Sequence, residues 1–262
     1  MSKTLLPVVF RHGFILKRTR FIEIDILRGV CVFLMVLLHI WWDLEYFKIL
    51  KVDRGVYQLQ HIVAPLFFVL MGMCLIITYS QYKRECKNFY YHAIFRGLYI
   101  FALGLFLSLI SFVVIPDRPI YFGVLHCIGL SIIFCLPFLR LQVYSIVFAV
   151  FFICTGFVLG SLPMREAGII HIVVGIHPQG MYRYTVDYFP LLPWLGVALL
   201  GVAIGSMLYR NGERCFSIPD LSRYRSVFPF SWLGRHSLVV YLLHQPVIVG
   251  FIQGFLYLSR AI

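Results

Sequence analysis

The sequence contains few charged residues and very few acidic ones. Asp and Glu number 11 among 262 residues, and charged residues of both signs make up 13%, whereas a soluble domain carries about 25%. This composition excludes an ordinary soluble fold. Lys and Arg raise the net charge to +12. Basic cytoplasmic loops of a membrane protein explain this excess, so no nucleic-acid partner is expected.

Paired cysteines and metal-ligand spacings are missing too. The seven cysteines form no CxxC pair, and most lie inside apolar runs, as small buried residues do in a core rather than in a disulfide or zinc framework. Neither HxxxH nor HxxE spacing is present, so no metal is expected. The sequence also lacks internal repeats and the short alternating segments of a transmembrane barrel.

Long apolar runs are abundant instead, in a chain that is 61% hydrophobic. Continuous runs of about 20 apolar residues indicate membrane-spanning helices. The sequence therefore predicts an all-α, polytopic transmembrane helix bundle. The first run lacks a small-residue cleavage site after it and is expected to be retained. About seven spans are predicted, at 26–47, 60–80, 91–114, 120–138, 142–161, 190–209 and 236–258.

The distribution of basic residues predicts the orientation. With the N-terminus inside, sixteen of the 23 Lys and Arg residues fall in cytoplasmic segments and seven outside, which favours N-terminus in and C-terminus out. Residues 1–25 are then a cytoplasmic segment and 26–262 a single transmembrane domain. The apolar part of 162–189 is too short to span, and is expected to be a re-entrant or interfacial piece on the outer side.

The first predicted span carries four ionisable residues along one face. Arg28 and His39 are eleven residues apart, a rise of roughly 16 Å, and at about 100° per residue they share a face. Asp25 and Asp43 continue this stripe at its two ends. Arg28 is also explained as an interfacial anchor, but a histidine deep in a span needs a partner or a cavity, which favours a functional role for His39.

Two more histidines lie at a similar depth. His126 is about six residues into a span entered from outside, and His244 is about nine residues into the last span. At 1.5 Å per residue, the three lie roughly 13 to 21 Å from the cytoplasmic edge of a ~30 Å core. We therefore expect a shared site containing His39, His126 and His244, with Asp43 beside it.

Polar residues at both ends of the bundle suggest binding positions. Arg235, His236 and Ser237 open the last span, where free amide groups at the helix N-terminus bind anions. Ser237, Tyr241 and His244 then follow at i, i+4 and i+7, a polar stripe that leads inward. The outer end of the 190–209 span carries a carboxylate and aromatics that suit a sugar or form an ordinary aromatic belt. The expected substrate-binding residues are Asp187, Tyr188, Trp194 and Gln245.

Four blocks together resemble a known family, the catalytic domain of heparan-α-glucosaminide N-acetyltransferase. They are Glu23-Ile-Asp25-Ile-Leu-Arg28-Gly29 through His39 and Asp43, Phe122-Gly-Val-Leu-His126, Asp187-Tyr-Phe-Pro-Leu-Leu-Pro-Trp194-Leu-Gly196, and Leu233-Gly-Arg-His-Ser237 through His244-Gln245-Pro246. They extend over nearly the whole chain, from residue 21 to about 250. The Arg-to-His spacing is also similar to that of the broader transmembrane acyltransferase group.

The resemblance implies acetyl transfer across the membrane, from cytosolic acetyl-CoA to an amino-sugar or sugar acceptor outside. It makes His39 the catalytic histidine, acting as general base or as acetylated nucleophile, and places the coenzyme at the basic face near Arg28 and Arg235. The eukaryotic enzyme is longer than this chain, so a compact bacterial member in the cytoplasmic membrane is expected, with a different acceptor. The expected partners are membrane lipid, acyl-CoA and a sugar or glycan; a homodimer is left open.

A transporter or flippase is the alternative from another class, because buried histidines and carboxylates also relay protons. The sequence shows neither a two-fold repeat nor matching broken spans. A purely structural membrane subunit would leave three deep histidines unexplained. The residues therefore favour a membrane-embedded acetyltransferase.

Overall fold

The computed structural model describes residues 20–51, 54–84, 88–162, 168–178 and 180–261. Most of the N-terminal segment 1–25 lies outside this description. In the described residues, helices dominate and the only sheet is one two-stranded hairpin. The helices that form the bundle are α1 (Ile22–Tyr46), α2 (Arg54–Arg84), α3 (Phe89–Val114), α4 (Val124–Cys135), α5 (Ser145–Ser161), α7 (Leu191–Leu208) and α9 (Ser237–Ala261). The predicted all-α helical bundle is confirmed.

Six helical stretches of the described chain are long and apolar enough to cross a membrane. One of them, Val124–Ser161, contains both α4 and α5. Between them, the chain turns through the 3-10 segment η1 (Leu136–Tyr144), where Gln142 has a φ of 50°. At about 1.5 Å per residue, the 12 residues of α4 rise about 18 Å, which is shorter than the ~30 Å hydrocarbon core. The count of seven spans requires α4 and α5 to cross the membrane separately, so it stays a prediction.

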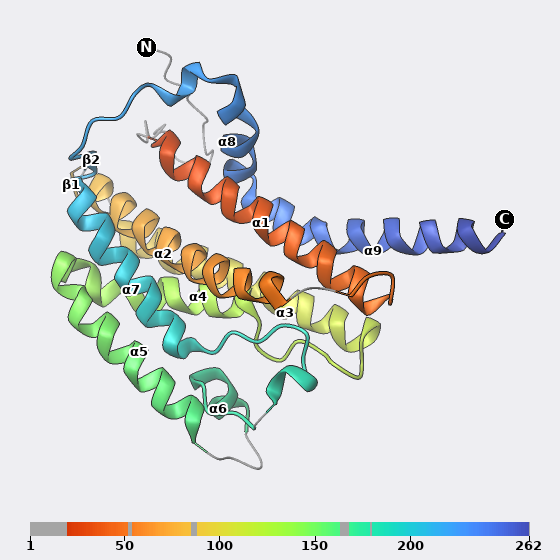
Figure 1. Cartoon of the computed structure of the whole chain (residues 1–262). Helices are drawn as coiled ribbons and strands as arrows, with labels where there is room; N and C mark the ends of the chain where they lie inside the picture. Colours follow the sequence, from red (N-terminus) through yellow and green to blue (C-terminus); the bar gives the residue numbers. More distant parts are fainter. Residues whose placement is uncertain (1–19, 52–53, 85–87, 163–167, 179, 262) are drawn as a thin grey trace.

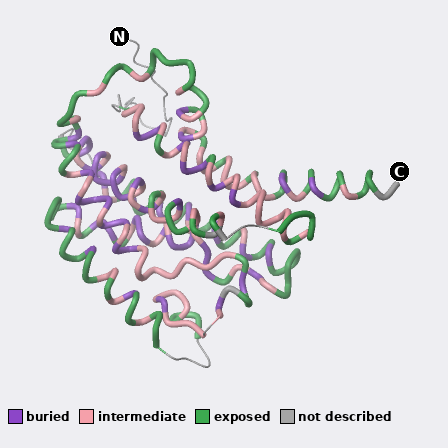
Figure 2. The backbone as a smooth tube through the Cα atoms, viewed as in Figure 1, coloured by how far each residue is buried: buried purple, intermediate pink, exposed green. Residues whose placement is uncertain are grey.

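The centre of the bundle is formed by α2, α4 and α7, where buried residues concentrate (Figure 2). The helices α2 and α7 touch backbone to backbone, since a Cβ at Gly72 would collide with the Ala198 carbonyl and one at Gly201 with that of Val69. Small residues allow such contacts between membrane helices. Fully buried Phe68 fills the space beside them, whereas α3 and α5 expose large apolar side chains, as lipid-facing helices do.

Two ends of the bundle are distinct in Figure 1. At one end, the start of α1 lies near α8 (Phe228–Arg235) and the hairpin of β1 (Tyr209–Arg210) and β2 (Glu213–Arg214). The hairpin is attached to α1 because Arg214 binds both carboxylate oxygens of Glu23 at 2.8 Å. Two 3-10 turns, η3 (Leu221–Arg223) and η4 (Arg225–Val227), connect the hairpin to α8.

The other end carries the segment that precedes α7. Residues 163–167 lie outside the description, and α6 (Ile169–Val174) and η2 (Met181–Arg183) follow. Both are far too short to span, as expected for 162–189. Nearby, Phe122 and Tyr188 form a parallel bridge, and Phe189 N–H donates to the Phe122 carbonyl at 3.0 Å. This extended pairing explains why the helix begins at Val124 and not at 120, as the sequence had predicted.

Candidate active site

The geometry of the site is determined by the crossing of α1 and α8. A Cβ at Gly29 would collide with the Phe230 carbonyl, and a Cβ at Gly234 with the Asp25 carbonyl. Neither glycine can be replaced without separating the two backbones. The crossing carries α8 onto the ionisable face of α1, and α9 continues along that face from Ser237.

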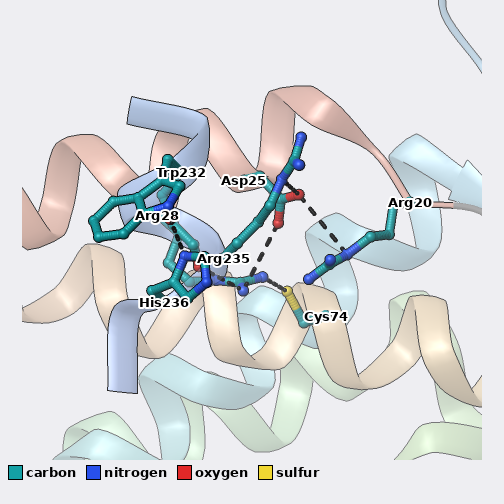
Figure 3. A network of polar contacts seen from close by, with 8 residues as sticks. Arg20, Asp25, Arg28, Cys74, Trp232, Arg235 and His236 are labelled. Carbon is teal, nitrogen blue, oxygen red and sulfur yellow. Dashed lines mark hydrogen bonds and ion pairs between the residues drawn. The ribbon is translucent and has the colours of Figure 1, made fainter. Parts of the chain in front are cut away.

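Asp25 is surrounded by arginines at this crossing (Figure 3). Its carboxylate is 5% exposed and lies 3.6 Å from Arg235 Nε, with Arg20 Nε and Arg28 Nη1 each at 3.9 Å. Arg28 also donates to the Gly234 carbonyl at 3.2 Å and to Cys74 Sγ at 3.0 Å. One carboxylate facing three guanidinium groups leaves the cluster with a net positive charge, which favours an anionic ligand.

The rings of His39 and His244 meet between α1 and α9. Their centroids are 4.6 Å apart and the planes are nearly perpendicular, at 85°. The stripe predicted along α1 is confirmed by these contacts, because Asp25 and Arg28 touch α8 while His39 and Asp43 touch α9. Two distant histidines of the sequence therefore form one pair.

Backbone hydrogen bonds determine which ring nitrogens are free. His39 Nδ1 lies 2.8 Å from the Met35 carbonyl, and His244 Nδ1 lies 2.6 Å from the Tyr241 carbonyl. A carbonyl only accepts, so each Nδ1 donates its proton and the Nε2 of each neutral ring carries a lone pair. His244 Nε2 is buried and has no hydrogen-bond partner among the described residues. A pair of imidazoles held in this way can accept protons.

Asp43 and Gln245 close the side of the histidine pair that faces away from the arginine cluster. The amide nitrogen of Gln245 donates to the two carboxylate oxygens of Asp43 at 2.9 and 3.0 Å. Within the described chain, Gln245 Oε1 and the indole Nε1 of Trp42 are buried without a hydrogen-bond partner. The Trp42 ring lies 5.0 Å from the His39 ring. Buried polar groups without partners are rare, so these atoms are candidates for ligand contacts.

His126 occupies a separate position at the start of α4. Gly123 N–H donates to His126 Nδ1 at 3.1 Å, and the ring stacks on Phe122 at 5.4 Å. Asp187 accepts a hydrogen bond from Val124 N–H at 3.0 Å and lies beside a cavity that His126 also lines. Burial raises the pKa of the Asp187 carboxyl to about 6, and the hydrogen bond from Val124 opposes this rise. In the described part of the chain, the His126 ring contacts Phe101 and Phe122, and no ring contact joins it to His39 or His244.

Tyr241 connects the two positions. Its side chain lines the cavity of His126 and Asp187, while its ring lies 5.5 Å from that of His244. It also packs against the core around α4 and α7 and against the core of α1. Tyr241 of α9 therefore reaches from the histidine pair to His126 and Asp187.

The remaining predicted residues take part in packing. Tyr188 donates to the Ile172 carbonyl at 2.7 Å, and Trp194 stacks on Phe68 at 5.0 Å. His236 lies against the Trp232 ring and its Nδ1 is 2.9 Å from the Trp232 carbonyl. Ser237 begins α9 directly after the α8 crossing. Tyr188 thus belongs to the segment before α7 and Trp194 to the first turn of α7, and both contact residues other than the histidine pair.

Sequence reasoning missed three neighbours of the site: Arg20, Cys74 and Trp42. Cys74 reaches Arg28 from α2, 46 positions away, and Arg20 precedes α1, so it lies outside the helical periodicity that defines the stripe. Trp42 was detectable, because it follows His39 by three residues and i, i+3 side chains on a helix are neighbours. Among the described residues, no group of three or more His, Cys, Asp or Glu side chains is arranged to hold a metal ion.

These features define a class, that of integral multi-pass membrane proteins with a polar site between helices. The family model "Heparan-alpha-glucosaminide N-acetyltransferase, catalytic" matches residues 20–246. The chain belongs to this family of acetyltransferases, as the resemblance of the four sequence blocks had predicted. Searches of curated proteins and of solved structures found no match.

Proposed function

We propose that the protein transfers an acetyl group from cytosolic acetyl-CoA to an amino-sugar or sugar acceptor on the other side of the membrane. The observation that carries this proposal is the pair of His39 and His244, with their Nδ1 atoms bonded to backbone carbonyls and their Nε2 atoms left as proton acceptors. Such a pair inside an acetyltransferase fold suits activation of an acceptor.

The coenzyme's anionic end is assigned to the arginine cluster. Arg28 and Arg235 share the single carboxylate of Asp25 with Arg20, so the cluster has charge left for phosphate groups. A guanidinium group can donate two parallel hydrogen bonds to two oxygens of one phosphate. His236, Ser237 and Tyr241 extend from this cluster towards the histidines. The separation of about 16 Å between Arg28 and His39 along α1 suits the long pantetheine arm of acetyl-CoA.

His39 is assigned the central role. As general base, its Nε2 takes the proton of the acceptor amine or hydroxyl while the acceptor attacks the thioester carbon. The carbon–sulfur bond breaks, and the proton passes to the leaving thiolate of CoA. As nucleophile, Nε2 attacks the thioester carbon, the carbon–sulfur bond breaks and CoA leaves as the thiolate; the acceptor then takes the acetyl group from the imidazole, and its proton passes to the thiolate. The indole N–H of Trp42 has no hydrogen-bond partner among the described residues. It is assigned to donate to the thioester carbonyl oxygen as negative charge develops on that oxygen.

Asp43 and Gln245 support this chemistry from the outer side. Gln245 is held by Asp43, and its free oxygen is available to the acceptor. Asp187, with Tyr188 in the same segment and Trp194 in the first turn of α7, is assigned to the path by which the acceptor arrives. His126 acts beside Asp187 rather than beside His39.

Acetyl transfer in proteoliposomes tests the proposal directly. Labelled acetyl-CoA is supplied on one side, and glucosamine-type acceptors on the other. Labelled acceptor is the expected product, and copurified CoA detected by mass spectrometry is expected as well. A folded protein that moves unmodified sugar across the membrane, but transfers no acetyl group, would instead support a transporter.

A further inference from the structure

A small cavity lies between α9 and the segment that precedes α7. Its volume is about 10 Å³, and its walls come from α3, α4, the segment before α7, and α9. Three of the lining residues carry polar groups: His126, Asp187 and Tyr241. Three separate parts of the chain therefore place polar side chains around one small cavity: His126 from α4, Asp187 from the segment before α7, and Tyr241 from α9.

His126 requires a hydrogen-bond acceptor at this point. Its side chain is 1% exposed, and Nδ1 already accepts from Gly123 N–H. The neutral ring must then carry its proton on Nε2, which has no hydrogen-bond partner in the residues that the structure describes. Leaving a buried N–H unpaired is energetically unfavourable. A bound acceptor would remove this cost.

The size and charge of the cavity select its occupant. A water molecule needs roughly 10–15 Å³ of accessible space and two to four polar partners. A sugar is far too large for this volume, and the carboxylate of Asp187 disfavours an anion. The cavity therefore suits one water, and nothing larger.

We propose that His126, Asp187 and Tyr241 form a binding site for a single structural water molecule. His126 Nε2–H donates to the water, the water donates to the Asp187 carboxylate, and the Tyr241 hydroxyl completes its contacts. The site joins the start of α4 to α9 through polar contacts.

The water has a consequence for the histidine pair, which rests on the proposed function. The Tyr241 carbonyl receives the Nδ1 proton of His244, so anchoring Tyr241 fixes both the tautomer and the ring position of His244. His126 and Asp187 are then positioning residues that act through the water and Tyr241. They are expected to affect the rate of transfer rather than the binding of acetyl-CoA.

X-ray hydroxyl-radical footprinting tests the water itself, without any assay of activity. Radicals formed from a bound water oxidise the side chains beside it. Tyr241 is expected to be oxidised faster than fully buried Phe68, after correction for intrinsic reactivity, and His126→Leu is expected to abolish this difference. Equal oxidation of Tyr241 and Phe68 in the unmodified protein would show a dry cavity and overturn the proposal.

A second experiment tests the positioning role. His126→Leu and Tyr241→Phe are expected to lower kcat about tenfold and leave the KM for acetyl-CoA unchanged. An effect of this size is typical when a residue that hydrogen-bonds to a metal-binding histidine and orients it is replaced. His126→Asn, which keeps a side-chain N–H, is expected to restore much of the rate. Unchanged kcat in folded Tyr241→Phe would refute positioning. Footprinting remains informative even if the protein transfers no acetyl group, so the two proposals fail separately.

Discussion

Gln245 of α9 donates from one amide nitrogen to both carboxylate oxygens of Asp43 on α1, at 2.9 and 3.0 Å. These residues are 202 positions apart, and their contact holds the two helices together beside the histidine pair. His244 and Gln245 are adjacent on α9, and His39 and Asp43 lie about one turn apart on α1, so displacement of the contact is expected to displace the histidine pair.

Replacing Gln245 with Glu is expected to break this contact. Two carboxylates would then face each other in a partly buried place, with a loss of stability of about 1–3 kcal/mol and a lower transfer rate. Thermal unfolding in detergent and the transfer assay measure the two effects. The matched control is Gln253→Glu, at an exposed position of the same helix. Similar stability of the two variants would show that the contact contributes little.

His39→Ala is expected to lower acetyl transfer by about 10²- to 10⁴-fold, the usual contribution of a general base. Binding of CoA should survive, because its affinity comes mainly from the anionic end. Turnover and calorimetric affinity are measured together, with His61→Ala on an exposed face of α2 as the control. Near-normal turnover in a folded His39→Ala protein would remove His39 from the chemistry and leave His244 as the next candidate.

Arg28→Gln and Arg235→Gln are each expected to weaken the binding of acetyl-CoA. The loss should shrink at high salt, since screening already weakens the phosphate contacts of the unmodified protein. Asp25 keeps two arginines in either variant, so folding should persist. Arg223→Gln, whose side chain is 82% exposed, is the control. Calorimetry that finds the same affinity in all three variants would place the nucleotide elsewhere.

Trp42→Phe is expected to lower kcat while leaving the KM for acetyl-CoA unchanged. The variant keeps an aromatic ring against His39 but removes the indole N–H, and a donor that acts on developing charge affects the transition state rather than the ground state. Steady-state kinetics separate the two constants. An increase in KM alone would assign Trp42 to substrate binding.

Asp187 is expected to make stability depend on pH. Burial raises its pKa from 3.8 to about 6, so folding favours the neutral carboxyl. The resulting stabilisation is present below about pH 4 and is lost as pH rises through about 6. Asp187→Asn should flatten this fall in Tm, whereas Asp220→Asn, at an exposed position, should not. The same slope in both variants would contradict the assignment.

The sequence predicted what a single helix determines. Asp25, Arg28, His39 and Asp43 share a face because residues rotate by about 100° along α1, and apolar length alone identified most spans. Contacts between distant segments were not predictable. The helix α8 has only eight residues and follows two short turns, so its apolar pattern is too short to detect. The separation of His126 from the other histidines depends on the pairing of Phe122 with Tyr188, which depth along a span does not reveal.

The crossing of α1 and α8 at Gly29 and Gly234 determines the position of α9 along α1. Only His236 separates α8 from α9, so the height at which α8 rests on α1 sets the height of every later residue of the chain. An added methyl group at either glycine would push α8 away from α1. Because α9 follows α8 directly, His244 and Gln245 would move with it although the methyl group contacts neither residue. Sequence change at these two glycines should therefore be tolerated less well than change at many residues nearer the substrate.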